Sequence, residues 1–121
     1  MSVSIEEYEK ALNSLKLALE EDKDDLVRDA TIQRYEYCVE LAWKTSKKIM
    51  GVDITAPKQV IRIMSQNKLI DDIQIWLTAL DKRNLSSHSY NVFLAEEVYD
   101  FSVHFIDHAY ALLEKLKEFK I

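Results

Sequence analysis

The chain has 121 residues, which fits one compact domain and leaves little room for a second. Hydrophobic residues make up 48% of it, which excludes a wholly disordered chain. Single copies of Gly and Pro argue against turn-rich β folds and glycine-rich phosphate loops, and one Cys excludes an internal disulfide. The composition therefore predicts one all-helical, cytoplasmic domain over residues 1–121.

The net charge is −5, with a mildly basic middle (residues 26–90) between two acidic ends. The excess of basic residues in the middle is too small for a general DNA-binding protein, but it allows a local phosphate site. No apolar run approaches the roughly 20 residues that span a bilayer, and the acidic N-terminus does not resemble a signal peptide. We therefore expect neither a DNA partner nor a membrane.

Apolar residues at steps of three and four predict the helices in chain order. Ser4 and Glu7 have the spacing of a capping box, at the start of a helix that ends within residues 20–25. A second helix runs from about Asp25 to Met50, and Gly51 suits a left-handed cap. It has two apolar sides, so the second side is a candidate subunit interface. One side carries Ala30, Tyr37, Leu41 and Ile49, and the other carries Tyr35, Val39, Ala42 and Trp43.

Three further helices are predicted in the second half of the chain. Thr55 reads as a cap before Pro57, where a short helix begins that ends near Asn67. Asp71 caps the next helix, and a polar break over residues 84–91 separates it from the last one. The last helix carries the cleanest stripe, formed by Leu94, Val98, Phe101, Phe105, Ala109, Leu112 and Leu116. The predicted fold is all-α, a bundle of four main helices with one additional short helix.

The segment from Arg83 to Tyr90 differs from the rest of the chain. Arg83 continues the apolar stripe of its helix, so its guanidinium should point toward a buried or interfacial region and needs an anionic partner. His88 lies about 140° further round an ideal helix, so the two meet only if the helix ends or bends between them. Asn84 and the two serines after it favour such a break, and Tyr90 shares the side of His88 if the chain is extended there.

These residue types are sufficient for RNA cleavage without a metal. Arg83 can hold two phosphate oxygens, and His88 can take the 2′-hydroxyl proton or protonate the leaving 5′-oxygen. A single histidine per chain leaves one of the two roles, general base or general acid, unfilled, and a dimer would supply a second histidine. A purely structural interpretation also stands, in which an arginine and a histidine at a helix end bond to loose carbonyls and complement the helix dipole.

The segment from Arg83 to Tyr90 resembles the motif of the HEPN superfamily, an arginine followed a few residues later by a histidine. With a tyrosine two residues after the histidine, it is similar to HEPN toxins paired with minimal nucleotidyltransferases. Residues 34–45, 57–62 and 76–81 resemble the nucleotidyltransferase substrate-binding branch of the same superfamily. Together the similarity spans roughly residues 5–118.

The resemblance implies an up-and-down bundle that forms a homodimer, with the motif of each chain near the dimer interface. It implies a minimal nucleotidyltransferase partner encoded nearby, and RNA as the substrate. Arg83 and His88 would be the ribonuclease residues, Asn84 a supporting polar group, and Tyr90 the hydroxyl that the partner modifies with AMP. No metal and no cofactor are expected.

Two classes of function stay open. In the first, the chain is a metal-independent endoribonuclease toxin that a partner minimal nucleotidyltransferase neutralises. In the second, it is the non-catalytic substrate- or nucleotide-binding subunit of a two-component nucleotidyltransferase.

Other reactive residues have simpler interpretations. His104 and His108 are four residues apart on the last helix, where a metal would need further ligands from elsewhere, so boundary packing is the better explanation. Cys38 lies among apolar neighbours and is interpreted as an inert core thiol. Both tryptophans fall on helical stripes, and Lys44, Lys47 and Lys48 form a small basic cluster that is solvated by default and contacts a partner or RNA as the second possibility.

Overall fold

The computed structural model describes residues 3–88 and 91–119, with the backbone alone described for residues 86–88. Within these residues all regular structure is helical and no strand is present, as the sequence predicts. The five helices are α1 (Ile5–Glu20), α2 (Asp25–Met50), α3 (Pro57–Gln66), α4 (Ile73–His88) and α5 (Val92–Glu118). None of these helices is long and apolar enough to cross a membrane.

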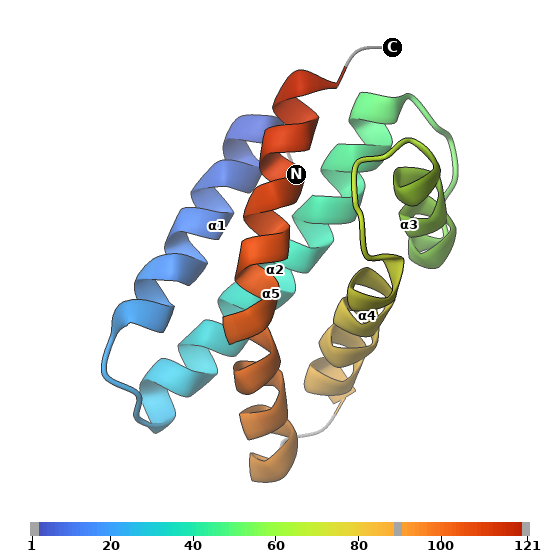
Figure 1. Cartoon of the computed structure of the whole chain (residues 1–121). Coiled ribbons are helices and arrows are strands. Elements are labelled where there is room, and N and C mark those ends of the chain that lie inside the picture. The colour runs from blue at the N-terminus through green and yellow to red at the C-terminus, as the bar shows by residue number, and fades with distance from the viewer. Residues whose placement is uncertain (1–2, 89–90, 120–121) are drawn as a thin grey trace.

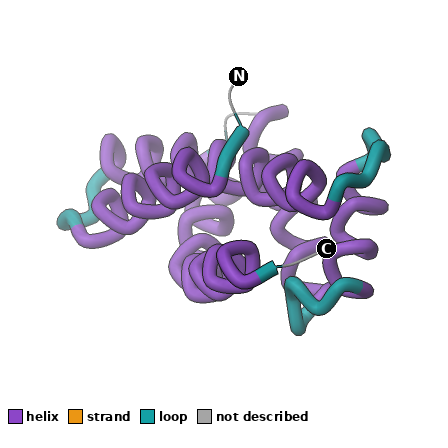
Figure 2. Tube along the Cα trace, turned by 90° about the horizontal axis from the view of Figure 1, so that it is seen from above, coloured by secondary structure: helices purple, strands orange, loops and turns teal. Residues whose placement is uncertain are grey.

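Four long helices form a bundle, and the short α3 packs on one side of it (Figure 1). The α2 helix contacts each of the other four, and α5 contacts α1, α2 and α4. The α1 and α4 helices lie on opposite sides of this central pair and run in the opposite direction to it. Seen from above, the loops are confined to the ends of the helices (Figure 2). The predicted four-helix bundle with an additional short helix is therefore confirmed.

Local capping chemistry accounts for most of the helix ends. The Ser4 hydroxyl accepts a hydrogen bond from the backbone N–H of Glu7 at 3.1 Å, and Asp24 caps α2 with its carboxylate. Gly51 ends α2 with a φ of 69°, a left-handed conformation that strains residues with a Cβ. Pro57 is the first residue of α3, where its missing N–H costs no hydrogen bond.

Two of the predicted caps are displaced. Ala56, which makes no side-chain cap, directly precedes α3, and Pro57 sets that start through its fixed φ without help from Thr55. At α4 the carboxylate of Asp72, rather than that of Asp71, accepts from the N–H of Ile75 at 3.3 Å. Adjacent aspartates suit a cap equally well, so the backbone path decides which of them is used.

The predicted break after Arg83 is wrong, because α4 continues through residues 84–87 and ends at His88. Asn and Ser each cost a helix only a few tenths of a kcal/mol relative to good helix formers, and no Gly or Pro interrupts this stretch. Tertiary contacts outweigh that cost. Lys82 pairs with Glu97 of α5 at 3.1 Å, and Arg83 pairs with Glu40 of α2.

The apolar side of α2 that carries Ala30, Tyr37, Leu41 and Ile49 is covered mostly within the chain. Leu41 is fully buried, Ala30 and Ile49 are half-buried, and Tyr37 alone of the four predicted residues is exposed, at 42%. The α1 helix packs on one side of α2, and α3, α4 and α5 pack on others. The other side is buried as well, with Tyr35, Val39, Ala42 and Trp43 all in the core, so the bundle itself covers most of both apolar sides.

A cluster of aromatic rings joins α2, α4 and α5 in the core. Phe105 lies at its centre, with ring centroids at 4.8 Å from Trp76, 5.6 Å from Tyr35 and 5.7 Å from Phe101. The Tyr35 hydroxyl donates a hydrogen bond to the Ala79 carbonyl of α4 at 2.7 Å. These contacts hold α4, and with it Arg83, against α2.

Candidate functional site

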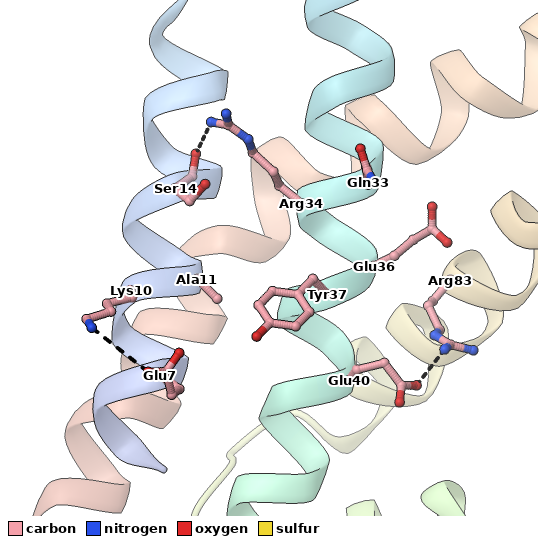
Figure 3. A pocket seen from close by; sticks show the side chains of 10 residues that line it. All are labelled: Glu7, Lys10, Ala11, Ser14, Gln33, Arg34, Glu36, Tyr37, Glu40 and Arg83. Carbon is pink, nitrogen blue, oxygen red and sulfur yellow. Dashed lines mark hydrogen bonds and ion pairs between the residues drawn. The ribbon is translucent and has the colours of Figure 1, made fainter. Parts of the chain in front are cut away.

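Arg83 extends from α4 toward α2, where it meets the anionic partner that its position on an apolar stripe requires. Its Nη2 lies 2.7 Å from Oε1 of Glu40 (Figure 3), and its Nη1 also donates to Oδ1 of Asn84 at 3.4 Å. The Arg83 side chain is 31% exposed and that of Glu40 is 20% exposed. The guanidinium is therefore held in place while part of it stays accessible.

Glu40 contacts a second cation with its other oxygen. Its Oε2 lies 3.0 Å from the Nζ of Lys44, one helical turn further along α2. A single half-buried carboxylate thus bridges Lys44 and Arg83, which come from different helices. The guanidinium of Arg83 has the geometry to hold two oxygens of an incoming phosphate in place of this carboxylate.

Two cavities border Arg83, one on each side. The larger, of about 550 Å³, lies between α1 and α2 and is lined by Arg34, Tyr37, Glu40 and Arg83 among others (Figure 3). The smaller, of about 330 Å³, is lined by residues of the α2, α3 and α4 region, including Pro57, Arg83 and Asn84. Arg83 and Glu40 therefore line both cavities, and Asn84 contacts Arg83 and lines the smaller one.

The described residues do not bring together all of the predicted site. His88 is the last residue of α4, and its side chain lies outside the description, as does the whole of Tyr90. On a continuous helix, positions 83 and 88 are about 140° apart around the axis. The bend that would have put both on one face of the same chain is absent from the α4 backbone.

Sequence reasoning missed Glu40 and Lys44 as parts of this site. Their own pairing has a local signal, since a glutamate four residues before a lysine on a helix forms an ion pair. The pairing of Glu40 with Arg83 joins residues far apart in the sequence and has no such signal. The sequence indicated that Arg83 needs an anionic partner, but it did not indicate that Glu40 is that partner.

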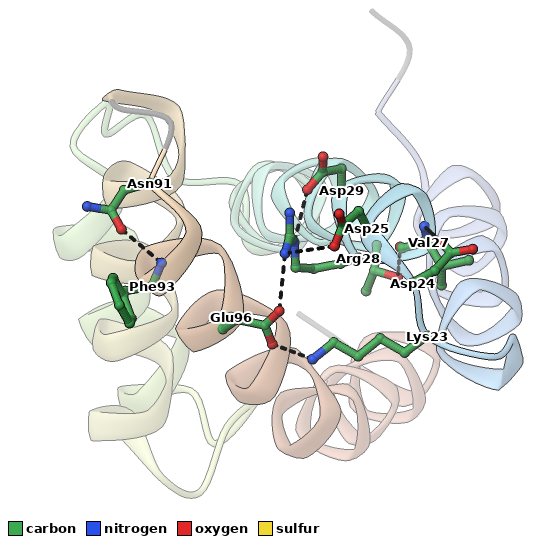
Figure 4. Close-up of polar contacts among 10 residues, drawn as sticks. Lys23, Asp24, Asp25, Val27, Arg28, Asp29, Asn91, Phe93 and Glu96 are labelled. Atoms are coloured by element: carbon green, nitrogen blue, oxygen red, sulfur yellow. Dashed lines mark hydrogen bonds and ion pairs between the residues drawn. The ribbon is translucent and has the colours of Figure 1, made fainter.

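A second charge cluster, at the N-terminal end of α2, is built differently (Figure 4). Arg28 is only 3% exposed and lies 3.1 Å from Asp29, 3.2 Å from Glu96 of α5 and 3.4 Å from Asp25, while Lys23 also pairs with Glu96. Carboxylates surround this arginine, so a phosphate would be repelled. The cluster fastens the start of α5 to α2 and does not form a binding site.

The hydrogen bond from Lys23, together with Arg28, lowers the pKa of Glu96 below its usual value of 4.5. A carboxyl with a lowered pKa in the folded state stabilises the fold above its unfolded pKa, and this contribution is lost as the pH falls through the folded pKa. We therefore expect the wild type to be more stable than Glu96→Gln at pH 7, with the difference shrinking below pH 4.5. Urea denaturation of both proteins at pH 7 and at about pH 2.5 measures this difference in the free energy of unfolding.

Glu97→Gln is the matched control for this measurement. Glu97 is the next residue on α5, and it lies 3.1 Å from Lys82 with a side chain that is 51% exposed. Its replacement should change stability little, because exposed single ion pairs contribute at most about 1 kcal/mol. A stability difference for Glu96→Gln that is the same at both pH values would contradict the assigned role of its charge.

The remaining candidates fit structural roles. Burial raises the pKa of the Cys38 thiol to about 12, so the thiol stays protonated and unreactive, in agreement with the inert core thiol predicted. Within residues 3–85 and 91–119 no group of three metal-ligating side chains is found, and His104 is exposed while His108 is half-buried. Trp76 is in the core at 2% exposed, and Trp43 is 9% exposed.

Comparison with known proteins agrees with the resemblance seen in the motifs. A family described as nucleotidyltransferase substrate binding protein like matches residues 3–118. A Haemophilus influenzae protein named probable ribonuclease HepT is 30% identical over 104 residues, which cover 79% of this chain and 70% of that protein. A crystal structure of a Thermus thermophilus protein matches with a TM-score of 0.83 and 34% identity, covering 91% of this chain and 98% of the other. The chain therefore belongs to the nucleotidyltransferase substrate-binding-like branch of the HEPN superfamily.

Proposed function

We propose that this protein is the toxin of a two-gene toxin–antitoxin pair, a metal-independent endoribonuclease that uses Arg83 and His88. The observation that carries the proposal is the placement of Arg83, partly exposed, paired with Glu40 and bordered by two cavities. The similarity to a protein named probable ribonuclease HepT supports the same conclusion.

In the proposed reaction, Arg83 exchanges its contact with Glu40 for two non-bridging oxygens of an RNA phosphate. The 2′-hydroxyl oxygen attacks the phosphorus while the bond to the 5′-oxygen breaks, and the negative charge that grows on the phosphoryl oxygens is stabilised by the guanidinium. His88 takes the 2′-hydroxyl proton or gives a proton to the leaving 5′-oxygen. Because positions 83 and 88 lie on different sides of α4, the proposal includes a homodimer in which two copies contribute to one site.

The proposed off-switch is modification of Tyr90 by a minimal nucleotidyltransferase encoded nearby. The tyrosine oxygen attacks the α-phosphorus of ATP, forms Tyr–O–AMP and releases pyrophosphate. The added phosphate carries a negative charge into the motif and competes with substrate phosphate for Arg83. Silencing would then be electrostatic and would not require a change of fold.

Replacing His88 by alanine tests the ribonuclease directly. Loss of a general acid or base typically lowers a rate by 10²–10⁴-fold, so the purified His88→Ala protein should cleave single-stranded RNA at least about a hundredfold more slowly than the wild type. His104→Ala, which removes an exposed histidine of α5, should cleave at the wild-type rate. Equal rates for wild type and His88→Ala would exclude His88 from the reaction.

Replacing Tyr90 by phenylalanine tests the modification. Incubation of the wild-type chain with the neighbouring nucleotidyltransferase and ATP should add one AMP, which intact-protein mass spectrometry detects. Tyr90→Phe should gain none and should keep its ribonuclease activity in the presence of the partner. Tyr110→Phe, which alters a half-buried tyrosine of α5 that lines neither cavity beside Arg83, is the control and should be modified like the wild type. AMP on Tyr90→Phe would place the acceptor elsewhere.

A second candidate function is favoured by the description of the matching family, which refers to substrate binding for a nucleotidyltransferase. In that function the chain is a non-catalytic subunit, and Arg83 holds the phosphate of a nucleotide or of another substrate for the partner enzyme. Expression of the chain without its partner distinguishes the two candidate functions. A toxin should arrest growth, and both Arg83→Ala and co-expression of the partner should relieve the arrest, whereas a non-catalytic subunit should leave growth unaffected.

A further inference from the structure

The C-terminal end of α2 carries a third cavity, of about 460 Å³, which no part of the proposed reaction uses. We name it the lysine cavity, because Lys44, Lys47 and Lys48 line it together with Trp43, Val3 and residues 51–52. The chain as a whole has a net charge of −5, yet none of the described residues that line this cavity is acidic.

The three lysines differ in what they already contact. Lys44 pairs with Glu40, and Lys48 donates a hydrogen bond to the Val3 carbonyl at 2.8 Å. Lys47 makes no hydrogen bond or ion pair with the described residues. Lysines in the last turn of a helix complement its dipole, which explains part of this charge but not the hollow that they surround.

Trp43, which also lines the lysine cavity, carries an unsatisfied hydrogen-bond donor. Its side chain is 9% exposed, and its indole N–H is buried without a hydrogen-bond acceptor among the described residues. A buried donor left without a partner costs about 1–3 kcal/mol, so such groups are normally satisfied. The Nζ of Lys44 also lies 5.6 Å from the centre of the Trp43 ring. The lysine cavity is therefore lined by three lysines and by a tryptophan whose N–H has no acceptor among the described residues.

Glu40 connects the lysine cavity to the Arg83 site. One of its oxygens contacts Lys44 and the other contacts Arg83, so the two cationic groups are separated by no more than one carboxylate and two hydrogen bonds. Lys44 lines the lysine cavity together with Lys47 and Lys48, so Glu40 is the carboxylate that lies between this cavity and Arg83.

We infer that the lysine cavity is a phosphate subsite for the same RNA strand that Arg83 engages, and this inference rests on the proposed function. Two neighbouring cationic sites, the lysine cavity and Arg83, suit two phosphates of one single-stranded RNA, which carries a negative charge at every nucleotide. Lysine contacts to phosphate fix the position of a strand without reading its sequence. The cavity would set which phosphate reaches Arg83, and it would raise affinity equally for all sequences.

The test uses His88→Ala as the common background, so that bound RNA is not cut. Binding of a short single-stranded RNA is measured across a range of salt concentrations, and the slope of log K against log salt counts the phosphates contacted. Adding Lys47→Gln or Lys48→Gln should each lower the steepness of this slope by about 0.7. The weakening should be the same for oligo-A and for oligo-U.

Lys115→Gln is the matched control, since Lys115 lies in the last turn of α5 and does not line the cavity. It should leave the slope unchanged, and thermal unfolding confirms that each variant is folded. If Lys47→Gln and Lys48→Gln bind RNA with the parental slope, the inference is wrong while the proposed function is unaffected. If the parent binds no RNA at any salt, the proposed function fails as well.

Tryptophan fluorescence gives a second measurement that does not depend on RNA. Inorganic tripolyphosphate should change the emission of Trp43, and Lys47→Gln should reduce this response, while Trp76 is shielded in the core. A response to tripolyphosphate without any RNA binding would overturn the assignment of the cavity to RNA.

Discussion

Replacing Arg83 by alanine is expected to lower the single-turnover rate of RNA cleavage by about 10²–10³-fold, the usual effect of removing one group that stabilises charge in a transition state. The guanidinium is the cation at the boundary of both cavities, and its pairing with Glu40 fixes it before substrate binds. Without it, Glu40 would also present a carboxylate that repels the phosphate. Quenched-flow or gel assays with enzyme in excess measure the rate.

Two further variants make this prediction specific. Arg83→Lys keeps the positive charge but loses the planar pair of donors, so it should recover only a small part of the rate. Arg62→Ala removes an exposed arginine of α3 and should cleave as the wild type does. If Arg83→Ala cleaves normally, the arginine serves only to pair with Glu40, and the structural interpretation of this segment is correct.

The fold was predictable because its main determinants are local. The bounds of α2, from Asp25 to Met50, follow from an aspartate cap at one end and a left-handed glycine at the other. The α5 stripe that includes Phe105 and Leu112 is buried as its spacing predicts. A nearly glycine- and proline-free sequence leaves few alternatives to helices at these positions.

The end of α4 was not predictable by the same reasoning. Asn84 and the serines after it weaken a helix when considered alone, but Lys82 and Arg83 anchor this turn to other helices through Glu97 and Glu40. Such contacts depend on how the helices pack, which no local pattern encodes. The cavities beside Arg83 were missed for the same reason, since each is formed by residues from more than one helix.

On α2, burial does not follow the apolar pattern at every position. Tyr37 fits an apolar stripe with Leu41, yet Leu41 is fully buried and Tyr37 is 42% exposed. Both positions have the same helical periodicity, and the difference arises because the larger cavity opens beside Tyr37. Periodicity predicts which side of a helix is apolar, but it does not predict how much of that side a neighbouring helix covers.

Replacing Phe105 by alanine should lower the free energy of unfolding by about 3–5 kcal/mol, the range measured for large core aromatics. Phe105 has no exposed surface, and its ring contacts those of Trp76, Tyr35 and Phe101, so the loss opens a cavity where α2, α4 and α5 meet. Because ΔG of unfolding for a domain is only about 5–15 kcal/mol, the variant should be markedly less resistant to urea.

Phe93→Ala is the matched control for Phe105→Ala, since it removes the same side chain from the same helix at a position that is 86% exposed. It should change stability by no more than about 0.5 kcal/mol. The comparison also bears on function, because the ring of Phe105 helps to hold α4 against α2 and so sets the contact between Arg83 and Glu40. In conditions where Phe105→Ala remains folded, its RNA cleavage should fall, whereas that of Phe93→Ala should not. Equal urea midpoints for the two variants would show that the aromatic cluster does not hold these helices together.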